Sequence, residues 1–199
     1  EINEKNFDFR VSTMPTIDSE SIVLRVLDNK NINKNLRTLG LSSNLLEILN
    51  ESLKLTQGLI LISGPTGSGK TTTLYSILKE LDSEEKKIIT VEDPIEYKID
   101  SICQVAINNK IGLSFELVLK NILRQDPDVI FIGEVRDKFS LDIALQASLT
   151  GHLVIASIHA NNAVETISRL VDLDADPFLI SSTLKLIMAQ RLVLNYCNF

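Results

Sequence analysis

The sequence predicts an α/β protein with a mainly parallel sheet that is covered by helices on both faces. Two observations support this prediction. From residue 41 onward, short apolar runs typical of buried strands alternate with segments whose apolar residues recur at helical spacing. In addition, a stretch that fits G-x-x-x-x-G-K-[ST], residues 64–71, stands between one such run and one such segment. Ligands of sheets of this kind bind at the carboxyl ends of the strands.

The glycine-rich stretch predicts a phosphate-binding loop between a strand at 59–63 and a helix at 71–81. Its glycines let backbone N–H groups approach phosphate oxygens, and the helix N-terminus adds a positive dipole. Lys70 is expected to bind the β- and γ-phosphates of ATP, and the Thr71 hydroxyl is expected to bind Mg²⁺. A glycine-rich turn with a solvated lysine is the plain structural alternative. The predicted nucleotide-binding residues are Gly64, Pro65, Thr66, Gly67, Ser68, Gly69, Lys70, Thr71 and Thr72.

The other elements follow from the same periodicities and from turn residues. Helices are expected at 43–55, capped by Ser42 or Ser43, and at 114–124, 139–149, 162–172 and 177–189. Strands are expected at 7–11, 21–27, 87–91, 102–107, 128–132, 153–158 and 191–196. We interpret residues 1–30 as the C-terminal part of a small α/β N-terminal domain. Residues 31–40, which overlap an asparagine-rich stretch, are predicted to be a linker, and residues 41–199 an ATPase domain that continues further.

The composition of the chain argues against several classes of protein. The chain has 20 basic and 26 acidic residues and a net charge of −6, which disfavours a broad nucleic-acid-binding surface. No run approaches the ~18 apolar residues that span a membrane. Cys103 and Cys197 are far apart in the sequence and suggest no disulfide framework, which favours a reducing, cytoplasmic location.

Two acidic clusters follow predicted strands. In residues 92–96, one carboxylate could activate the attacking water and another could hold magnesium through water, unless the cluster is simply an acidic surface loop. Glu134 follows an apolar strand and fits the acid on the magnesium side of a phosphate-loop enzyme. The alternative there is an exposed turn with an Arg136–Asp137 pair.

Both histidines flank the strand expected at 153–158. His159 follows its carboxyl end and is the candidate sensor of the γ-phosphate. His152 lies at the other end, where a plain hydrogen-bonding role is the alternative. The spacing of the histidines and cysteines excludes a shared metal site.

With these residues placed, the chain resembles secretion ATPases of the type II secretion and type IV pilus assembly family. The resemblance rests on RVSTMPT (10–16), GPTGSGKTTTL (64–74), TVEDPIE (90–96), LRQDPD (123–128), GEVRD (133–137), TGHLV (150–154) and AQRL (189–192). It implies a RecA-like P-loop NTPase core and a cytoplasmic homo-hexamer, peripheral at the inner membrane. It further implies ATP hydrolysis that powers the assembly of pilin-like subunits through an inner-membrane platform protein, without direct nucleic-acid binding.

The resemblance also implies roles for single residues. Glu96 would be the catalytic glutamate, and Glu134 would support Mg²⁺ and water. Arg10 and Arg25 match arginines that the preceding domain sends toward the γ-phosphate. The candidate catalytic residues are therefore Glu96, Glu134, Lys70, Arg10, Arg25 and His159, with Arg136 and Arg191 as weaker candidates for interface or sensing roles.

The chain departs from the family pattern at residues 139–141, where Phe-Ser-Leu replaces a Glu-Thr-Ala run, and at Ser157 and Ala160, which replace threonines. The 14–16 stretch, the 189–192 stretch and Cys197 resemble assembly ATPases more than retraction ATPases. Assembly ATPases often continue into a four-cysteine segment, so Zn²⁺ is an expected ligand beyond the C-terminus. A RecA-like DNA translocase and a nucleotide-dependent interaction module with little turnover remain the alternative functions.

Overall fold

The computed structural model describes residues 8–27 and 35–194. Its centre is a six-stranded sheet with the order β5-β4-β6-β7-β3-β8, in which every neighbouring pair is parallel. The strands are β3 (Gly58–Ser63), β4 (Ile88–Glu92), β5 (Cys103–Ala106), β6 (Val129–Val135), β7 (Leu153–Ile158) and β8 (Leu184–Ala189). The predicted α/β class with a mainly parallel sheet is confirmed.

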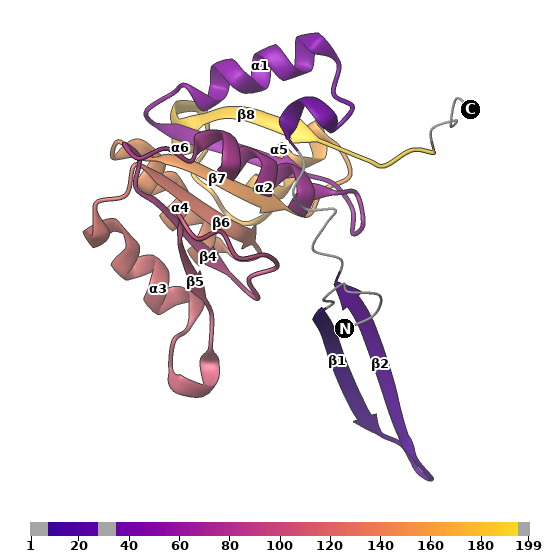
Figure 1. The fold of residues 1–199 in the computed structure, drawn as a ribbon. Coiled ribbons are helices and arrows are strands. Elements are labelled where there is room, and N and C mark those ends of the chain that lie inside the picture. The colour runs from indigo at the N-terminus through magenta and orange to yellow at the C-terminus, as the bar shows by residue number, and fades with distance from the viewer. Residues whose placement is uncertain (1–7, 28–34, 195–199) are drawn as a thin grey trace.

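Helices cover both faces of this sheet (Figure 1). They are α1 (Ser43–Leu53), α2 (Lys70–Leu81), α3 (Phe115–Ile122), α4 (Lys138–Leu149), α5 (Ala163–Asp172) and α6 (Pro177–Thr183). The helices α1 and α2 and a 3₁₀ turn (Leu36–Thr38) share one hydrophobic cluster, and α3 to α6 contribute to the other. None of the described helices is long and apolar enough to cross a membrane.

The strand before the phosphate loop illustrates why the apolar runs are continuous. All six residues of β3 are buried. Leu59 and Leu61 face one hydrophobic cluster, whereas Ile60 and Ile62 face the other. A parallel strand between two helical layers has no solvent-facing side and therefore needs apolar residues at every position.

Local capping fixes where three helices begin. The Ser42 hydroxyl accepts a hydrogen bond from the Leu45 amide at the start of α1, and Ser114 does the same for α3. At the start of α4, Asp137 and Ser140 form a reciprocal capping box. Ser140, one of the residues that depart from the family pattern, therefore has a structural role here.

The helix predicted at 177–189 is wrong in its second half, because α6 ends at Thr183 and residues 184–189 form β8. Leu186 and Met188 contact one hydrophobic cluster, and Leu184 and Ile187 contact the other. Pairing with β3 satisfies backbone groups that would otherwise form an open sheet edge, and this outweighs the helix propensity of Leu, Lys, Met and Ala. The strand predicted at 191–196 is not present over residues 191–194, and the rest lies outside the described residues.

A two-stranded antiparallel hairpin precedes this α/β unit (Figure 1). Its strands are β1 (Asp8–Pro15) and β2 (Glu20–Leu27), so β1 extends four residues beyond the strand predicted at 7–11. Arg10 lies directly opposite Arg25 in the register. Leu36, inside the predicted linker, is buried against α2. The division into domains at residues 30 and 40 stays a prediction.

Candidate active site

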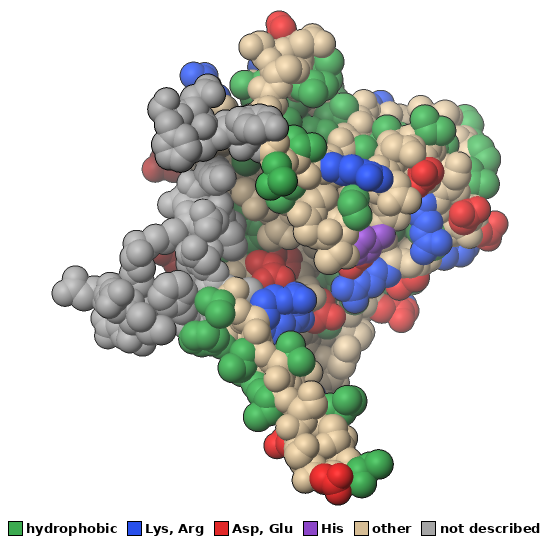
Figure 2. Space-filling view, turned by 90° about the vertical axis from the view of Figure 1, so that its right-hand side faces the viewer, with side chains coloured by type: hydrophobic (Ala, Val, Ile, Leu, Met, Phe, Trp, Pro, Cys, Tyr) green, Lys and Arg blue, Asp and Glu red, His purple; other side chains and the backbone are tan. Residues whose placement is uncertain are grey.

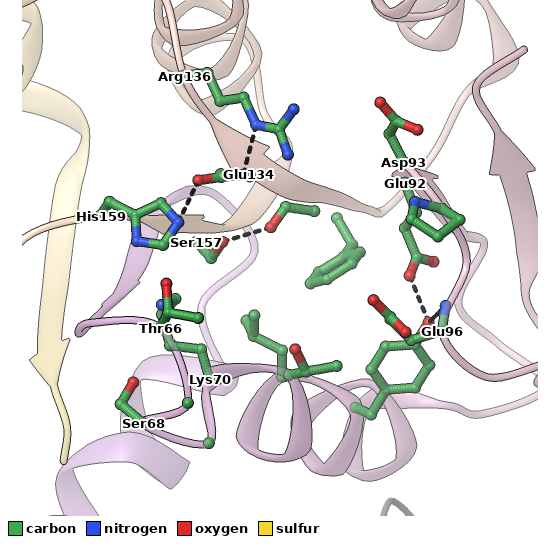
Figure 3. A pocket seen from close by; sticks show the side chains of 18 of the residues that line it. Thr66, Ser68, Lys70, Glu92, Asp93, Glu96, Glu134, Arg136, Ser157 and His159 are labelled. Carbon is green, nitrogen blue, oxygen red and sulfur yellow. Dashed lines mark hydrogen bonds and ion pairs between the residues drawn. The ribbon is translucent and has the colours of Figure 1, made fainter. Parts of the chain in front are cut away.

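A cavity of ≈ 640 Å³ lies at the carboxyl ends of the central strands (Figure 3). Five separate stretches of the α/β unit and the hairpin contribute to its walls. All six side chains predicted to be catalytic line it: Lys70, Glu96, Glu134, His159, Arg10 and Arg25. In the space-filling view, acidic, basic and histidine side chains gather around the hollow above the hairpin (Figure 2). The structure thus brings together residues that are up to 149 positions apart in the sequence, from Arg10 to His159.

The phosphate loop connects β3 to α2 through glycines in the left-handed region. Gly64 has φ 149°, and a Cβ atom there would lie 2.5 Å from the carbonyl oxygen of Gln190 and 2.5 Å from the Ser68 hydroxyl. Gly69 is the N-cap of α2 with φ 86°. These positions require glycine because a side chain would be strained and, at Gly64, would collide with its neighbours.

The Lys70 ammonium group lies over this loop and donates hydrogen bonds to the carbonyl oxygens of Gly64 (2.6 Å) and Pro65 (3.1 Å). Burial lowers the pKa of Lys70 because it disfavours the charged form, and the negative charge of Glu134 acts in the opposite direction. The cation is therefore held close to the glycine loop, opposite an acidic group.

The predicted nucleotide-binding residues divide into two groups. Six consecutive residues line the cavity: Thr66, Gly67, Ser68, Gly69, Lys70 and Thr71. Gly64, Pro65 and Thr72 are not part of its lining. Gly64 and Pro65 contribute through the carbonyl oxygens that accept from Lys70, and the Thr72 carbonyl accepts from Ser76 within α2.

Glu134 lies near the end of β6, where the register between β6 and β7 shifts after Ile132. This irregularity leaves Gly133 and Glu134 without a Cα partner in the register with β7, and such a bulge can redirect a side chain. The Glu134 carboxylate lies between His159, at 2.7 Å from Nε2 to Oε1, and Arg136, at 2.5 Å from Nε to Oε2. His159 is therefore placed against the acid of the site.

His152 lies before β7, at the opposite end of the strand from His159. Its Nδ1 atom is within hydrogen-bonding distance of the Ala147 carbonyl (3.1 Å) and the Thr150 hydroxyl (3.3 Å). This is the plain hydrogen-bonding role that the sequence left as an alternative.

The three carboxylates at the end of β4 and in the loop after it differ in their surroundings. Glu92 is 3% exposed and accepts hydrogen bonds from the hydroxyls of Tyr75 and Thr90 and from the Gln104 amide. Asp93 is exposed and Glu96 is half-buried, and both line the cavity. Figure 3 shows these acids on one side of the pocket and Glu134, Arg136 and His159 on the other. Of the two glutamates in this segment, Glu96 is the one whose carboxylate is not enclosed by donors.

Gln190 contacts the phosphate loop, although no role was predicted for it. Its side-chain amide donates to the Ser68 carbonyl (2.8 Å), and its backbone N–H donates to the Ser63 carbonyl (3.0 Å). This contact was not predicted because the residues of β8, which directly precede Gln190, were expected to be helical. Arg191, a weaker sequence candidate, does not line the cavity.

The crowding around Gly64 makes a testable prediction. Gly64→Ala should lower the free energy of unfolding by about 1–3 kcal/mol more than Gly40→Ala does, as measured by urea denaturation. Gly40 also has a positive φ (79°), but its added Cβ would meet nothing within 4 Å. The difference between the two variants therefore reports the cost of the collision at Gly64. Equal losses for the two variants would contradict this account of the loop.

The sequence profile of the family described as "Type II/IV secretion system protein" matches residues 1–199. The chain belongs to this family. It is 48% identical over 191 residues to the type II secretion system protein HxcR of Pseudomonas aeruginosa. It is also 48% identical over 196 residues to the type II secretion system ATPase E of Vibrio cholerae. These matches cover 96% and 98% of this chain but only 41% and 39% of the two relatives.

Two solved structures are also similar to this chain. The Legionella pneumophila ATPase DotB superposes with a TM-score of 0.78 at 29% identity, over 96% of this chain and 55% of DotB. The pilus retraction motor PilT with bound ADP gives a TM-score of 0.77 at 36% identity, over 93% of this chain and 55% of PilT. The predicted RecA-like core and the predicted secretion-ATPase family are confirmed.

Proposed function

We propose that this chain hydrolyses ATP as part of a ring-shaped cytoplasmic motor that assembles pilin-like subunits in type II secretion or type IV pilus biogenesis. The observation that supports this most directly is one cavity whose lining includes the phosphate loop, Glu96, Glu134, His159, Arg10 and Arg25. Phosphoryl transfer needs this set: donors around the phosphates, a group that positions water, and cations for the developing charge.

The phosphate loop would bind the β- and γ-phosphates through its backbone N–H groups and the Lys70 ammonium. The cavity also offers oxygen ligands of the type that Mg²⁺ prefers, the hydroxyl of Thr71 and the carboxylate of Glu134. Mg²⁺ would neutralise charge on the phosphate oxygens when bound. His159, which contacts Glu134, would hold that carboxylate in place and sense the γ-phosphate.

Glu96 would act as the general base that takes a proton from the attacking water. It lines the cavity on the side opposite Glu134. The buried Glu92 is a poorer candidate, because donors already occupy its carboxylate.

The hairpin would supply the cations for the transition state. Arg10 and Arg25 are direct cross-strand partners, an arrangement in which like charges repel each other. Both line the cavity, where a bound phosphate would relieve this repulsion. This is the physical support for assigning them to the γ-phosphate.

The similarities to curated relatives favour an assembly motor over a retraction motor. The type II secretion relatives are 46–48% identical, whereas the retraction motor PilT is 36% identical. A homo-hexamer, an inner-membrane platform protein as partner and peripheral membrane association belong to the same proposal. Cys197, the residue on which the expected Zn²⁺ binding depends, lies outside the described residues.

The test of nucleotide binding is Lys70→Ala in the full-length protein. It should weaken Mg-ATP binding about 10- to 100-fold in a calorimetric titration, because a charged hydrogen-bond donor to the phosphates is lost. Lys79→Ala, on the same helix but outside the cavity lining, is the matched control. Unchanged affinity of Lys70→Ala would refute the phosphate-loop assignment, and hydrolysis that requires DNA would favour a translocase instead.

A further inference from the structure

Tyr75 lies at the boundary between the phosphate-loop helix and the loop that holds Glu96. It is 1% exposed, and its ring packs edge-on against Phe131 and Tyr97, with centroid distances of 6.4 Å and 6.3 Å. On α2, Tyr75 follows Thr71 by four residues and therefore lies on the same helical face, one turn further along.

The Tyr75 hydroxyl uses its full hydrogen-bonding capacity in this position. It donates to the Glu92 carboxylate and accepts from the backbone N–H groups of Glu96 (3.2 Å) and Tyr97 (3.3 Å). Burial, together with the hydrogen bond to Glu92 and its charge, raises the pKa of Tyr75 above its usual range. The hydroxyl therefore stays a neutral donor, with its lone pairs directed at the two amides.

The Glu92 carboxylate has further hydrogen-bond donors besides Tyr75. Its second oxygen accepts from the Thr90 hydroxyl (2.6 Å) and from the Gln104 amide (3.3 Å). The same Gln104 donates to the Tyr97 carbonyl (2.9 Å) and accepts from the Ile99 amide (2.7 Å). A buried acid, a tyrosine and a glutamine thus fix the backbone of the loop that begins after β4.

We propose that Tyr75 is a positioning residue for Glu96, acting through the backbone of residues 96 and 97. This inference rests on the proposed function, in which Glu96 is the general base. Because Tyr75 and the phosphate-binding residues Lys70 and Thr71 belong to one rigid helix, the hydroxyl ties the position of the base to the position of the phosphate loop. Glu92 accepts the hydrogen bond of the Tyr75 hydroxyl and so orients it.

The test is a double-mutant cycle between Tyr75→Phe and Glu96→Gln in the full-length protein. Tyr75→Phe keeps the ring and should lower kcat about 10- to 100-fold, the scale of loss for a reacting group displaced by about 1 Å. KM and the Kd for Mg-ATP should stay within about twofold. In the Glu96→Gln background, Tyr75→Phe should change kcat by less than about twofold, because both changes remove the same contribution.

Tyr97→Phe is the matched control, since its hydroxyl makes no hydrogen bond among the described residues, and it should retain the wild-type rate. Hydrogen exchange gives a second readout: Tyr75→Phe should speed exchange at the amides of residues 96 and 97 below the melting temperature. If Tyr75→Phe does not fold, Gln104→Leu, which releases the same loop from the other side, should show the same kinetic pattern.

An unchanged kcat for Tyr75→Phe beside a slowed Glu96→Gln enzyme would overturn the role of Tyr75 alone. A Tyr75→Phe defect that adds in full to that of Glu96→Gln would also overturn it, because the two residues would then act independently. A wild-type rate for Glu96→Gln would instead refute the assignment of Glu96 as the base, and the role of Tyr75 would fall with it.

Discussion

Arg25→Ala is expected to lower ATP hydrolysis by the assembled protein by about 10³–10⁵-fold, the contribution of an arginine that stabilises transition-state charge in phosphoryl transfer. Nucleotide affinity should stay nearly intact, because the phosphate loop is untouched. For this chain itself we expect slow hydrolysis whose specific activity rises with protein concentration as rings form. Arg25→Ala should abolish that rise.

Arg37→Ala provides a control that removes an exposed arginine near the same segment without changing the cavity. It should show the concentration dependence of the wild-type chain. Specific activity that is constant over a hundredfold range of protein concentration, and that is the same for Arg25→Ala, would rule out a role for the hairpin in hydrolysis.

Glu96→Gln should retain nucleotide binding but lower turnover by about 10²–10⁴-fold, the range for loss of a positioned general base. The amide keeps the shape of the side chain but cannot take a proton from water. Steady-state hydrolysis by the full-length protein, together with a direct measurement of nucleotide affinity, separates the two effects.

Asp100→Asn is the control for Glu96→Gln, because it shows whether loss of any negative charge in this segment lowers the rate of hydrolysis. Asp100 lies further along the same loop, is paired with Lys98 at 2.7 Å and does not line the cavity, so its rate should match the wild type. If Glu96→Gln stays within about twofold of the wild-type rate, the base must be sought elsewhere, with Glu134 as the next candidate.

The phosphate loop and its flanking elements could be predicted because their chemistry is local. A continuous apolar run, fixed glycine spacing and a helical repeat are enough to define β3, the loop and α2. The caps at Ser42 and Ser114 are local in the same sense. Glu134 and His159 could be placed near the ligand site because ligands of parallel sheets bind at the carboxyl ends of the strands.

What could not be predicted depends on partners that are distant in sequence. Residues 184–189 become a strand only because the edge of β3 is available for pairing. Glu92 and Glu96 look alike in the sequence, but only Glu92 is buried with its carboxylate hydrogen-bonded, and one of its donors is Tyr75, 17 positions earlier. The contact of Gln190 with Ser68 spans 122 positions. No local pattern encodes these pairings.

The position of β3 between β7 and β8 has a thermodynamic consequence. His159 follows β7 and Gln190 follows β8, so the His159 wall of the cavity and the contact of Gln190 with the phosphate loop depend on the pairing of β3 with these two strands. A ligand that binds only the folded chain adds RT ln(1 + [L]/Kd) to its stability, about 2.7 kcal/mol at a hundredfold excess over Kd. Under the proposed function, a bound nucleotide would therefore stabilise the folded central sheet as well as take part in hydrolysis.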